Sequence, residues 1–257
     1  MENIIETICN LKVGEMVKID SRTANEFVFP KHYSGRKVNV SIAFGWIVEN
    51  DMKAVVTFGK PASDHLCRGI CGVEYSKNVH ELSRLCRTDD FQEPLSHFVG
   101  RCLRYLRQMD WIIVSYADTV MNHVGSVYQA LNFIYTGATR ERTVKYTEGN
   151  KHCRHYKQED QGDFRKVRTS KHRYVYFCTN NNKLKTEWNR CLSYKIEPYP
   201  KGENIHYTLG EYIEPIIVPS NIKKKEVELI AEVCRVCCER VSYNGVCENC
   251  GGGKVDA

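Results

Sequence analysis

Two pairs of cysteines near the end of the chain have the spacing of metal ligands. Cys234 and Cys237 form one Cys-x2-Cys pair, Cys247 and Cys250 form a second, and nine residues separate the pairs. Two such turns can surround a zinc ion with four thiolates, and a ribbon of about 20 residues is too small to fold on apolar burial alone. The spacing therefore predicts a ribbon with a structural Zn²⁺. Cys238 can replace Cys237 as a ligand, and redox and iron–sulfur sites share the motif.

A second chemical feature is the basic segment of residues 140–173. It holds 11 lysines and arginines against 5 aspartates and glutamates, so it accounts for the whole net charge of +6. Lysine and arginine neutralise phosphates, and the tyrosines and phenylalanine interleaved with them can stack on bases. The segment therefore predicts a polyanion as partner, although a solvated loop with scattered charge is the alternative. The expected contacts are Arg165, Lys166, Arg168, Lys171 and Arg173.

Three further side chains could carry acid–base chemistry. Asp118 follows an apolar strand and precedes a helix, so its carboxylate is expected in the crevice at a sheet edge where α/β proteins place ligands. It is the leading candidate for a general base or orienting group, and capping of the following helix explains the position nearly as well. His32 and Tyr33 place a titratable imidazole beside a phenol, which can bind iron, move a proton or stack on a base. A purely structural role for the histidine stays open.

The elements that must position these side chains follow from the periodicity of apolar residues. Alternation over residues 38–44 and 54–58, around turn formers at 49–51, predicts a β-hairpin. Leu95 begins a stripe spaced i, i+3, i+4, i+7, i+8, i+11, which predicts an amphipathic helix over residues 95–106 with Pro94 at its first position. These elements belong to one folded domain.

Further elements surround that helix in the sequence. Residues 80–87 predict a strand, the continuous apolar run 111–114 predicts a strand covered on both faces, and 124–131 predict a shorter helix. Aromatic strands are expected at 133–136 and 174–177. The alternation of strands and helices predicts a mixed α/β sheet with helices against its faces.

Length and composition agree with a folded chain. The 257 residues, of which 42% are hydrophobic and 26% charged, fit one large domain with an appendage. No apolar run approaches the roughly 20 residues of a membrane-spanning helix, and the first residues lack the pattern of a secretory signal. The thirteen cysteines therefore predict metal ligands, catalytic thiols or buried apolar residues of a cytosolic protein before disulfides.

Several spaced motifs resemble the Mom family of phage DNA-modification proteins over roughly residues 25–201. In order along the chain they are HYSGR at 32–36, VVTFG at 55–59, ELSRL at 81–85, PLS at 94–96, VSYAD at 114–118, HVGSVYQA at 123–130, FIYTG at 133–137, KHRY at 171–174 and PYPK at 198–201. The cysteine pairs lie outside this resemblance. Their role is therefore predicted from spacing alone.

The resemblance implies a GNAT-like N-acetyltransferase fold that binds acetyl-CoA and modifies the amino group of adenine in double-stranded DNA. Such a protein would act in the cytoplasm of an infected or lysogenic bacterial host and hide phage DNA from restriction enzymes. The family's product carries a carbamoylmethyl group, which simple acyl transfer cannot generate because the base nitrogen is bonded to a methylene carbon. An iron ion has been associated with the family.

A GNAT-like fold would receive a pyrophosphate at the loop after strand 80–87 and the start of the helix at Leu95. Ser96 could add a hydroxyl there, and Arg84 could contact a phosphate or carboxylate. A capping serine and an exposed strand arginine are the alternatives. The glycine-rich loop of ordinary acetyltransferases is absent, and Asp89 and Asp90 bring negative charge to the site. The family also uses the position of Tyr128, for which core packing is the alternative.

We therefore expect a GNAT-like catalytic domain over residues 1–200, a linker or extension over 201–228 and a zinc ribbon over 229–257. Base extrusion or locally opened DNA would give access to the adenine amino group. Two other functions stay open. One is an acetyltransferase acting on an amine of hypermodified pyrimidines in phage DNA, and the other is a non-catalytic zinc-ribbon protein that binds DNA.

Overall fold

The main body of the protein is a seven-stranded mixed sheet. The computed structural model describes residues 14–146, 164–202 and 216–220. The strand order is β1-β2-β3-β4-β5-β9-β6, and every neighbouring pair is antiparallel except β4 and β5, which are parallel. The strands are β1 (Glu15–Ile19), β2 (Ile42–Val48), β3 (Asp51–Gly59), β4 (Val79–Arg87), β5 (Trp111–Asp118), β6 (Ile134–Ala138) and β9 (Lys171–Cys178).

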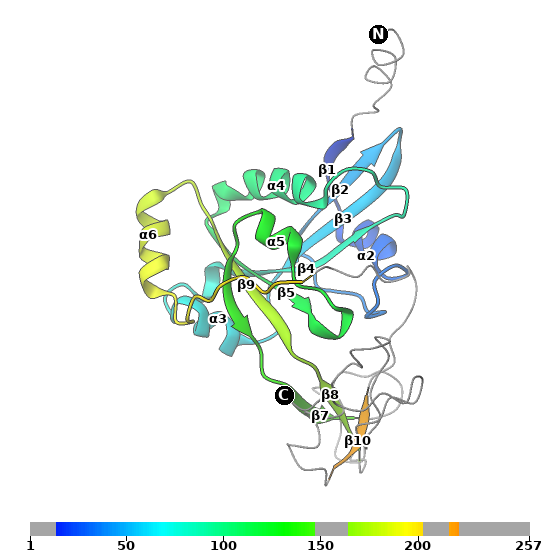
Figure 1. Ribbon diagram of the computed structural model, residues 1–257. Helices are drawn as coiled ribbons and strands as arrows, with labels where there is room; N and C mark the ends of the chain where they lie inside the picture. The colour runs from blue at the N-terminus through cyan, green and yellow to red at the C-terminus, as the bar shows by residue number, and fades with distance from the viewer. Residues whose placement is uncertain (1–13, 147–163, 203–215, 221–257) are drawn as a thin grey trace.

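Helices cover both faces of this sheet (Figure 1). On one face lie α4 (Leu95–Leu106) and α5 (Ser126–Ala130), and on the other lie α2 (Ser21–Val28), α3 (Asp64–Cys71) and α6 (Asn182–Cys191). Short 3₁₀ turns occur at Ser76–Asn78, Arg107–Met109 and Thr119–Met121. The predicted mixed α/β sheet with flanking helices is confirmed. Within the ranges above, no helix combines the length and apolar character needed to cross a bilayer.

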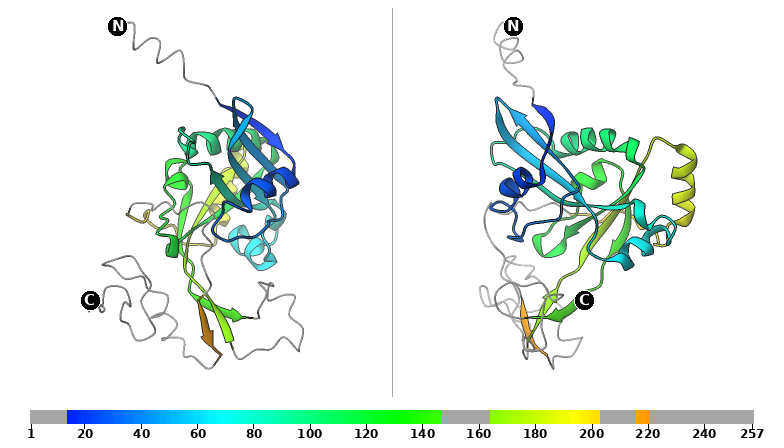
Figure 2. Two further views of the ribbon diagram at one scale, coloured as in Figure 1. Left: turned by 90° about the vertical axis from the view of Figure 1, so that its right-hand side faces the viewer. Right: turned by 180° about the vertical axis from the view of Figure 1, so that it is seen from behind.

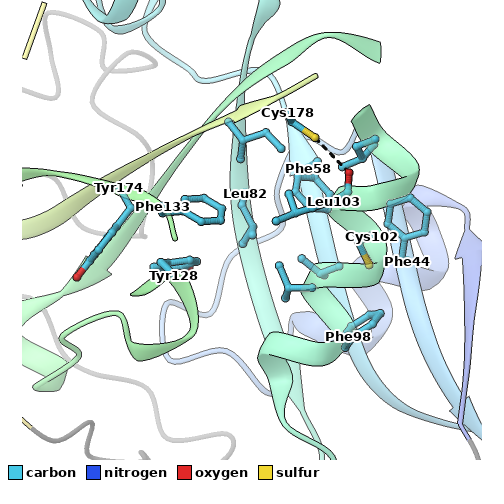
Figure 3. Close-up of a cluster of buried hydrophobic side chains, with 14 of the residues drawn as sticks. Phe44, Phe58, Leu82, Phe98, Cys102, Leu103, Tyr128, Phe133, Tyr174 and Cys178 are labelled. Carbon is cyan, nitrogen blue, oxygen red and sulfur yellow. Dashed lines mark hydrogen bonds between the residues drawn. The ribbon is translucent and has the colours of Figure 1, made fainter. Parts of the chain in front are cut away.

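The core explains why the sheet needs two helical layers. Ile113 on β5 packs with the α4 face, whereas Ile112 and Val114 pack with α3 and α6, so the strand is covered on both faces as predicted. Figure 3 shows the α4 side, where Phe98 and Leu103 meet the aromatic residues of the sheet and the Leu103 carbonyl accepts a hydrogen bond from the Cys178 thiol at 3.2 Å. Among the cysteines of the described ranges, five are buried as apolar residues and Cys191 is exposed.

The hairpin and the central helix are present, although the first strand of the hairpin is Ile42–Val48 rather than the predicted 38–44. β2 and β3 meet at a two-residue turn, Glu49-Asn50, whose positive φ angles of 50° and 69° match the twist of antiparallel strands. α4 covers the predicted 95–106, with Pro94 as its N-cap rather than its first residue. The helix expected at 124–131 is the shorter α5, because Gly125 adopts φ 77° just before it.

A second, three-stranded sheet projects from the main body. It contains β7 (Arg142–Lys145), β8 (Phe164–Arg168) and β10 (Ile217–Pro219) in the antiparallel order β10-β8-β7. Figures 1 and 2 show this sheet beyond the start of β9, away from α4 and α6. The predicted extension 201–228 therefore contributes a strand to a sheet that carries part of the basic segment.

Candidate functional site

The site is created where β4 and β5 separate. Their parallel ladder contains only three pairs, from Val79 opposite Ile112 to Glu81 opposite Val114, although β4 continues to Arg87 and β5 to Asp118. Just beyond the last pair, the Ser115 hydroxyl donates to the Leu82 carbonyl at 3.1 Å and bridges the widening gap. The two strands then diverge, and an opening is left in the middle of the sheet.

A pocket of about 360 Å³ occupies this opening. Its lining includes Leu82 and Tyr128 from the α4 side of the sheet and Tyr116 from the α3 side, so the pocket passes through the sheet. It extends along β4 to the start of α4. The lining residues are His32, Tyr33, Glu81, Leu82, Ser83, Arg84, Leu85, Cys86, Arg87, Asp89, Leu95, Tyr116, Ala117, His123, Gly125, Ser126, Val127, Tyr128 and Lys171.

Arg84 and Arg87 are the two cations of β4 that line this pocket, and Arg84 is the one beside the strand irregularity. The β3–β4 register shifts between Thr57 and Phe58, which leaves Ser83 as an extra residue beside Arg84. One guanidinium nitrogen, Nη1, donates to the Ser83 carbonyl at 2.7 Å, whereas the buried Nε has no hydrogen-bond partner among the residues described. Burial lowers the pKa of this guanidinium, but arginine stays charged in proteins. Arg84 therefore keeps donor capacity for an anionic ligand.

Glu81 is a pocket residue that the sequence analysis missed. Burial raises the pKa of its carboxyl group, and the nearby charges of Arg84 and Lys171 offset part of that effect. A carboxyl group with a raised pKa in a cleft has the properties of a general base or acid. The sequence signal was a glutamate inside a strand, but its importance depends on the end of the β4–β5 ladder, which the sequence does not reveal.

His32 lies in the pocket as a neutral donor. Burial lowers the pKa of its imidazole to about 3, and the charges of Arg84, Lys171 and His123 act in the same direction. Its Nδ1 accepts the backbone N–H of Ser34 at 3.1 Å, so the ring proton of the neutral form is on Nε2. The ring stacks on Tyr33 with centroids 4.2 Å apart. The expected pair is therefore present, with His32 suited to donate a hydrogen bond rather than to accept a proton.

The residues of this site do not fit an iron centre. A histidine that binds a metal normally donates its second ring N–H to a neighbour, whereas Nδ1 of His32 is already an acceptor. Within residues 14–146, 164–202 and 216–220, no group of three or more histidine, cysteine, aspartate or glutamate side chains could hold a metal ion.

Asp118 lies beside the pocket and contacts Lys171, which lines it. Its carboxylate accepts the backbone N–H of Val120 and the hydroxyl of Thr169, each at 3.3 Å, and forms an ion pair with Lys171. The Asp118 side chain is 10% exposed and that of Lys171 35%. Asp118 thus caps the 3₁₀ turn after β5, as the alternative interpretation had it, and also holds Lys171. Of the two, only Lys171 lines the pocket.

Tyr128 and Ser96 have different relations to the pocket. Tyr128 lines it and also packs against Phe133 and Tyr174, so its ring is part of the core as well as of the pocket wall. Burial raises the pKa of its phenol to about 12. Ser96 does not line the pocket, although its neighbour Leu95 does. No side chain from the described ranges accepts a hydrogen bond from the backbone N–H groups in the first turn of α4.

The HVGSVYQA motif places a second histidine in the pocket. His123 lies with its ring 6.3 Å from that of Tyr33, and its backbone N–H donates to the Asp118 carbonyl at 3.1 Å. Gly125 follows at φ 77°, where a Cβ atom would lie 2.6 Å from the Tyr174 ring. Only glycine fits this close approach, and it allows α5 to bring Tyr128 to the pocket. His123 was part of a quoted motif but not a candidate site residue.

The five expected polyanion contacts are divided between two places. Arg165, Lys166 and Arg168 lie on β8 in the small sheet, outside the pocket. Lys171 lines the pocket. Arg173 donates to the Thr136 hydroxyl and carbonyl, and its guanidinium lies 3.4 Å from the ring centroid of Tyr194, so the side chain is held against the main body.

The four cysteines of the expected zinc ribbon lie outside the described residues, so the ribbon stays a prediction. Purified protein should contain about one zinc per chain, because four thiolates complete one tetrahedral site. Cys247→Ser should lower the zinc content measured by mass spectrometry of metals. Cys191→Ser, which removes an exposed thiol of α6, is the matched control and should keep it. Full zinc loading after replacement of all four ribbon cysteines by serine would contradict the assignment.

Comparisons with solved structures find acetyltransferases. An N-acetyltransferase from Staphylococcus aureus Mu50 is 11% identical with a TM-score of 0.40, and covers 65% of this chain and 99% of its own. An acetyltransferase-like protein of Salmonella typhimurium, solved with its cofactor acetyl-CoA, is 8% identical with a TM-score of 0.43. The match covers 66% of this chain and 96% of the other. A GNAT-family acetyltransferase from Streptococcus pneumoniae is 8% identical with a TM-score of 0.39. The match covers 64% of this chain and 99% of the other.

None of the curated proteins compared with this chain matches it. A protein-family model, in contrast, matches residues 14–201 of this chain in one continuous stretch. That stretch contains β1 to β6, β9 and every pocket residue. More than half of the sequence thus matches the model of the Mom protein family, and this chain belongs to that family.

Proposed function

We propose that this protein is an acyl-CoA-dependent transferase that modifies the N6 amino group of adenine in double-stranded DNA. The observation that carries the proposal is the pocket between β4 and β5, which combines the buried carboxyl group of Glu81 with the positive charges of Arg84 and Lys171. Membership of the Mom family supports DNA as the substrate. Its role would be to protect phage DNA from restriction in the cytoplasm of a bacterial host.

The pocket has the features that a coenzyme A ligand requires. Its outer end reaches Leu95 at the start of α4, where backbone N–H groups and the helix dipole favour a pyrophosphate. Arg87 lines the same stretch of β4, and the buried Nε of Arg84 offers an unused donor. Asp89 opposes an anion there, so the arginines must outweigh it. Bound acetyl-CoA would supply an activated acyl group.

The residues at the inner end are suited to handle the proton of the amine. In acyl transfer from acetyl-CoA, the adenine amino nitrogen forms a bond to the carbonyl carbon, the bond from that carbon to sulfur breaks, coenzyme A leaves as the thiolate, and the nitrogen loses a proton. Glu81 is positioned to take that proton, since its carboxyl lies in the pocket and has a raised pKa. His32, with its proton on Nε2, can donate a hydrogen bond to an oxygen of the reacting group.

The walls of the pocket would exclude water and orient the base. Tyr116 and Tyr128 line it from opposite faces of the sheet, and burial keeps both phenols neutral by raising each pKa. Tyr33 and the neutral His32 add two more rings on which a flat base can stack. An adenine taken out of the DNA stack would therefore meet aromatic surfaces on several sides.

The test is the mass spectrum of nucleosides from plasmid DNA of cells that produce the full chain. We expect a deoxyadenosine derivative of increased mass that is absent when the same cells carry an empty vector. A derivative on a pyrimidine instead would support the alternative acetyltransferase, which needs only ordinary acyl transfer. Unmodified DNA in the presence of soluble protein that binds DNA but not acetyl-CoA would support the non-catalytic alternative and contradict the proposal.

A further inference from the structure

The small sheet has two chemically different faces. Residues directly opposite in an antiparallel ladder share a face, and successive residues alternate between faces. Arg142 pairs with Arg168, and Lys166 pairs with both Val144 and Ile217. One face, which we call the basic face, is therefore formed by Arg142, Val144, Phe164, Lys166, Arg168, Ile217 and Pro219.

The opposite face is the more buried of the two, although Lys145, which pairs with Arg165 on it, is exposed. Val167 and Val218 lie on it and are 5% and 2% exposed. Arg165 also lies on it, where Nε donates to the Thr143 hydroxyl at 2.6 Å and Nη2 to the Thr143 carbonyl at 3.1 Å. The basic face is the more exposed one, because Arg142 is exposed and Phe164 and Ile217 are 53% and 40% exposed.

Like charges gather on the basic face. Arg142 lies directly opposite Arg168 in the ladder, and Lys166 is two residues before Arg168 on the same face. Burial lowers the pKa of the Lys166 ammonium to about 8, and the charges of Arg36 and Arg168 act in the same direction. The described parts of the basic segment, 140–146 and 164–173, hold eight lysines and arginines and one acidic residue, Glu141. Such a concentration of positive charge attracts a polyanion.

This face is continuous with the rim of the pocket. Arg36 comes three residues after Tyr33, and Arg168 comes three residues before Lys171, while Tyr33 and Lys171 both line the pocket. Three residues of extended chain span at most about 10 Å. Figure 1 shows β8 leading directly into β9, which carries Lys171. An extended ligand held on the basic face can therefore reach the pocket.

We propose that the basic face, together with Arg36, binds the phosphate backbone of double-stranded DNA and thereby presents a neighbouring base to the pocket. The inference rests on the proposed function and refines it, because it excludes Arg165 and Arg173 from the direct contacts and includes Arg36 and Arg142. Exposed Phe164 lies on the same face, where an apolar side chain can pack against a base step that opens.

The test compares two variants that lose the same charge at opposite ends of the molecule. Lys166→Ala/Arg168→Ala removes two cations from the basic face, and Lys183→Ala/Lys185→Ala removes two exposed cations from α6. Binding of a fluorescent 20-base-pair duplex is measured at several salt concentrations. Each lost phosphate contact should flatten the slope of log K against log salt by about 0.9, so the first variant should lose more slope than the second.

Two further measurements keep the outcome clear. Acetyl-CoA binding by calorimetry should be the same in both double variants, which shows that the pocket is folded. Arg142→Glu, a substitution at an exposed position, should weaken DNA binding without affecting packing. Equal salt slopes in the two double variants would overturn the assignment of this face. The proposed function would not be affected by that result, because it is tested separately by the nucleoside masses of DNA from cells that produce the unaltered protein.

Discussion

Glu81→Gln is expected to lower the initial rate of base modification by about 10² to 10⁴. Glutamine keeps the size of the side chain and most of its hydrogen bonding, but it cannot take a proton at neutral pH. The carboxyl group lies where the β4–β5 ladder ends, inside the pocket and near Arg84 and Lys171. The measurement is the rate at which modified deoxyadenosine forms in duplex DNA with purified protein and acetyl-CoA.

The same substitution has an expected signature in stability. Because burial raises the pKa of Glu81, the folded protein disfavours its charged form. That cost is absent below the ordinary glutamate pKa of about 4.3, where both folded and unfolded states are protonated, and it is complete above the raised pKa of the folded state. Glu81→Gln should therefore raise Tm at neutral pH, and the difference should disappear as the pH falls below about 4.

A matched control separates loss of chemistry from loss of charge. Glu93→Gln neutralises a carboxylate that pairs with His97 outside the pocket, and it should leave the rate near that of the unaltered protein. Since Glu81 must be ionised to act as a base, the rate of the unaltered protein should rise with pH through the raised pKa of Glu81. An unchanged rate in Glu81→Gln, with Tm raised as expected, would remove Glu81 from the mechanism.

The parts of the fold that the sequence predicted are those with local signals. The helix at 95–106 has an apolar stripe over its whole length and buries five residues on one face, so periodicity alone located it. The hairpin of β2 and β3 was located because alternation is interrupted by turn formers at Glu49 and Asn50. Both are decided by residues close together in the chain.

Three helices were missed although each begins at a capping residue. Asp20, Ser63 and Asn181 accept hydrogen bonds from backbone N–H groups in the first turns of α2, α3 and α6. These helices are short or bury few residues: α2 and α3 have eight residues each, and Trp188 is the one buried residue of α6. A search for N-cap residues would have marked the start of each of these helices.

The site depended on information that is not local. β9 inserts between β5 and β6, and β4 pairs in parallel with β5 for only three residues, so the position of the pocket follows from strand pairing. The sequence indicated His32, Tyr33, Arg84 and Tyr128, which the structure brings to one pocket. It did not indicate Glu81 or His123. It placed Lys171 among the expected DNA contacts, and the structure adds that Lys171 lines the pocket and pairs with Asp118 beside it.

That ion pair leads to the second large expected effect, a loss of about 10² in rate for Lys171→Met. Lys171 is the cation that lines the pocket opposite Arg84 on β4, and removal of one preorganised charged donor from a reacting site costs about 10² to 10³. Methionine keeps the apolar length of the lysine side chain. The loss of the partner of a buried carboxylate costs at most about 3 to 5 kcal/mol, and less here because Lys171 is 35% exposed.

Asp118→Asn should lower the rate by a similar factor, and the double variant Asp118→Asn/Lys171→Met should be no slower than Lys171→Met alone. The reason is that the Asp118 carboxylate holds Lys171 in place and does not itself line the pocket, so its effect passes through the lysine.

A catalytic Asp118 acting as base would instead add its own loss to that of Lys171→Met. An aspartate that only capped the turn at Val120 would tolerate asparagine, which is an equally good cap, and Asp118→Asn would then modify DNA at the parental rate. Rates of the three variants, measured below substrate saturation, therefore separate positioning, catalysis and capping.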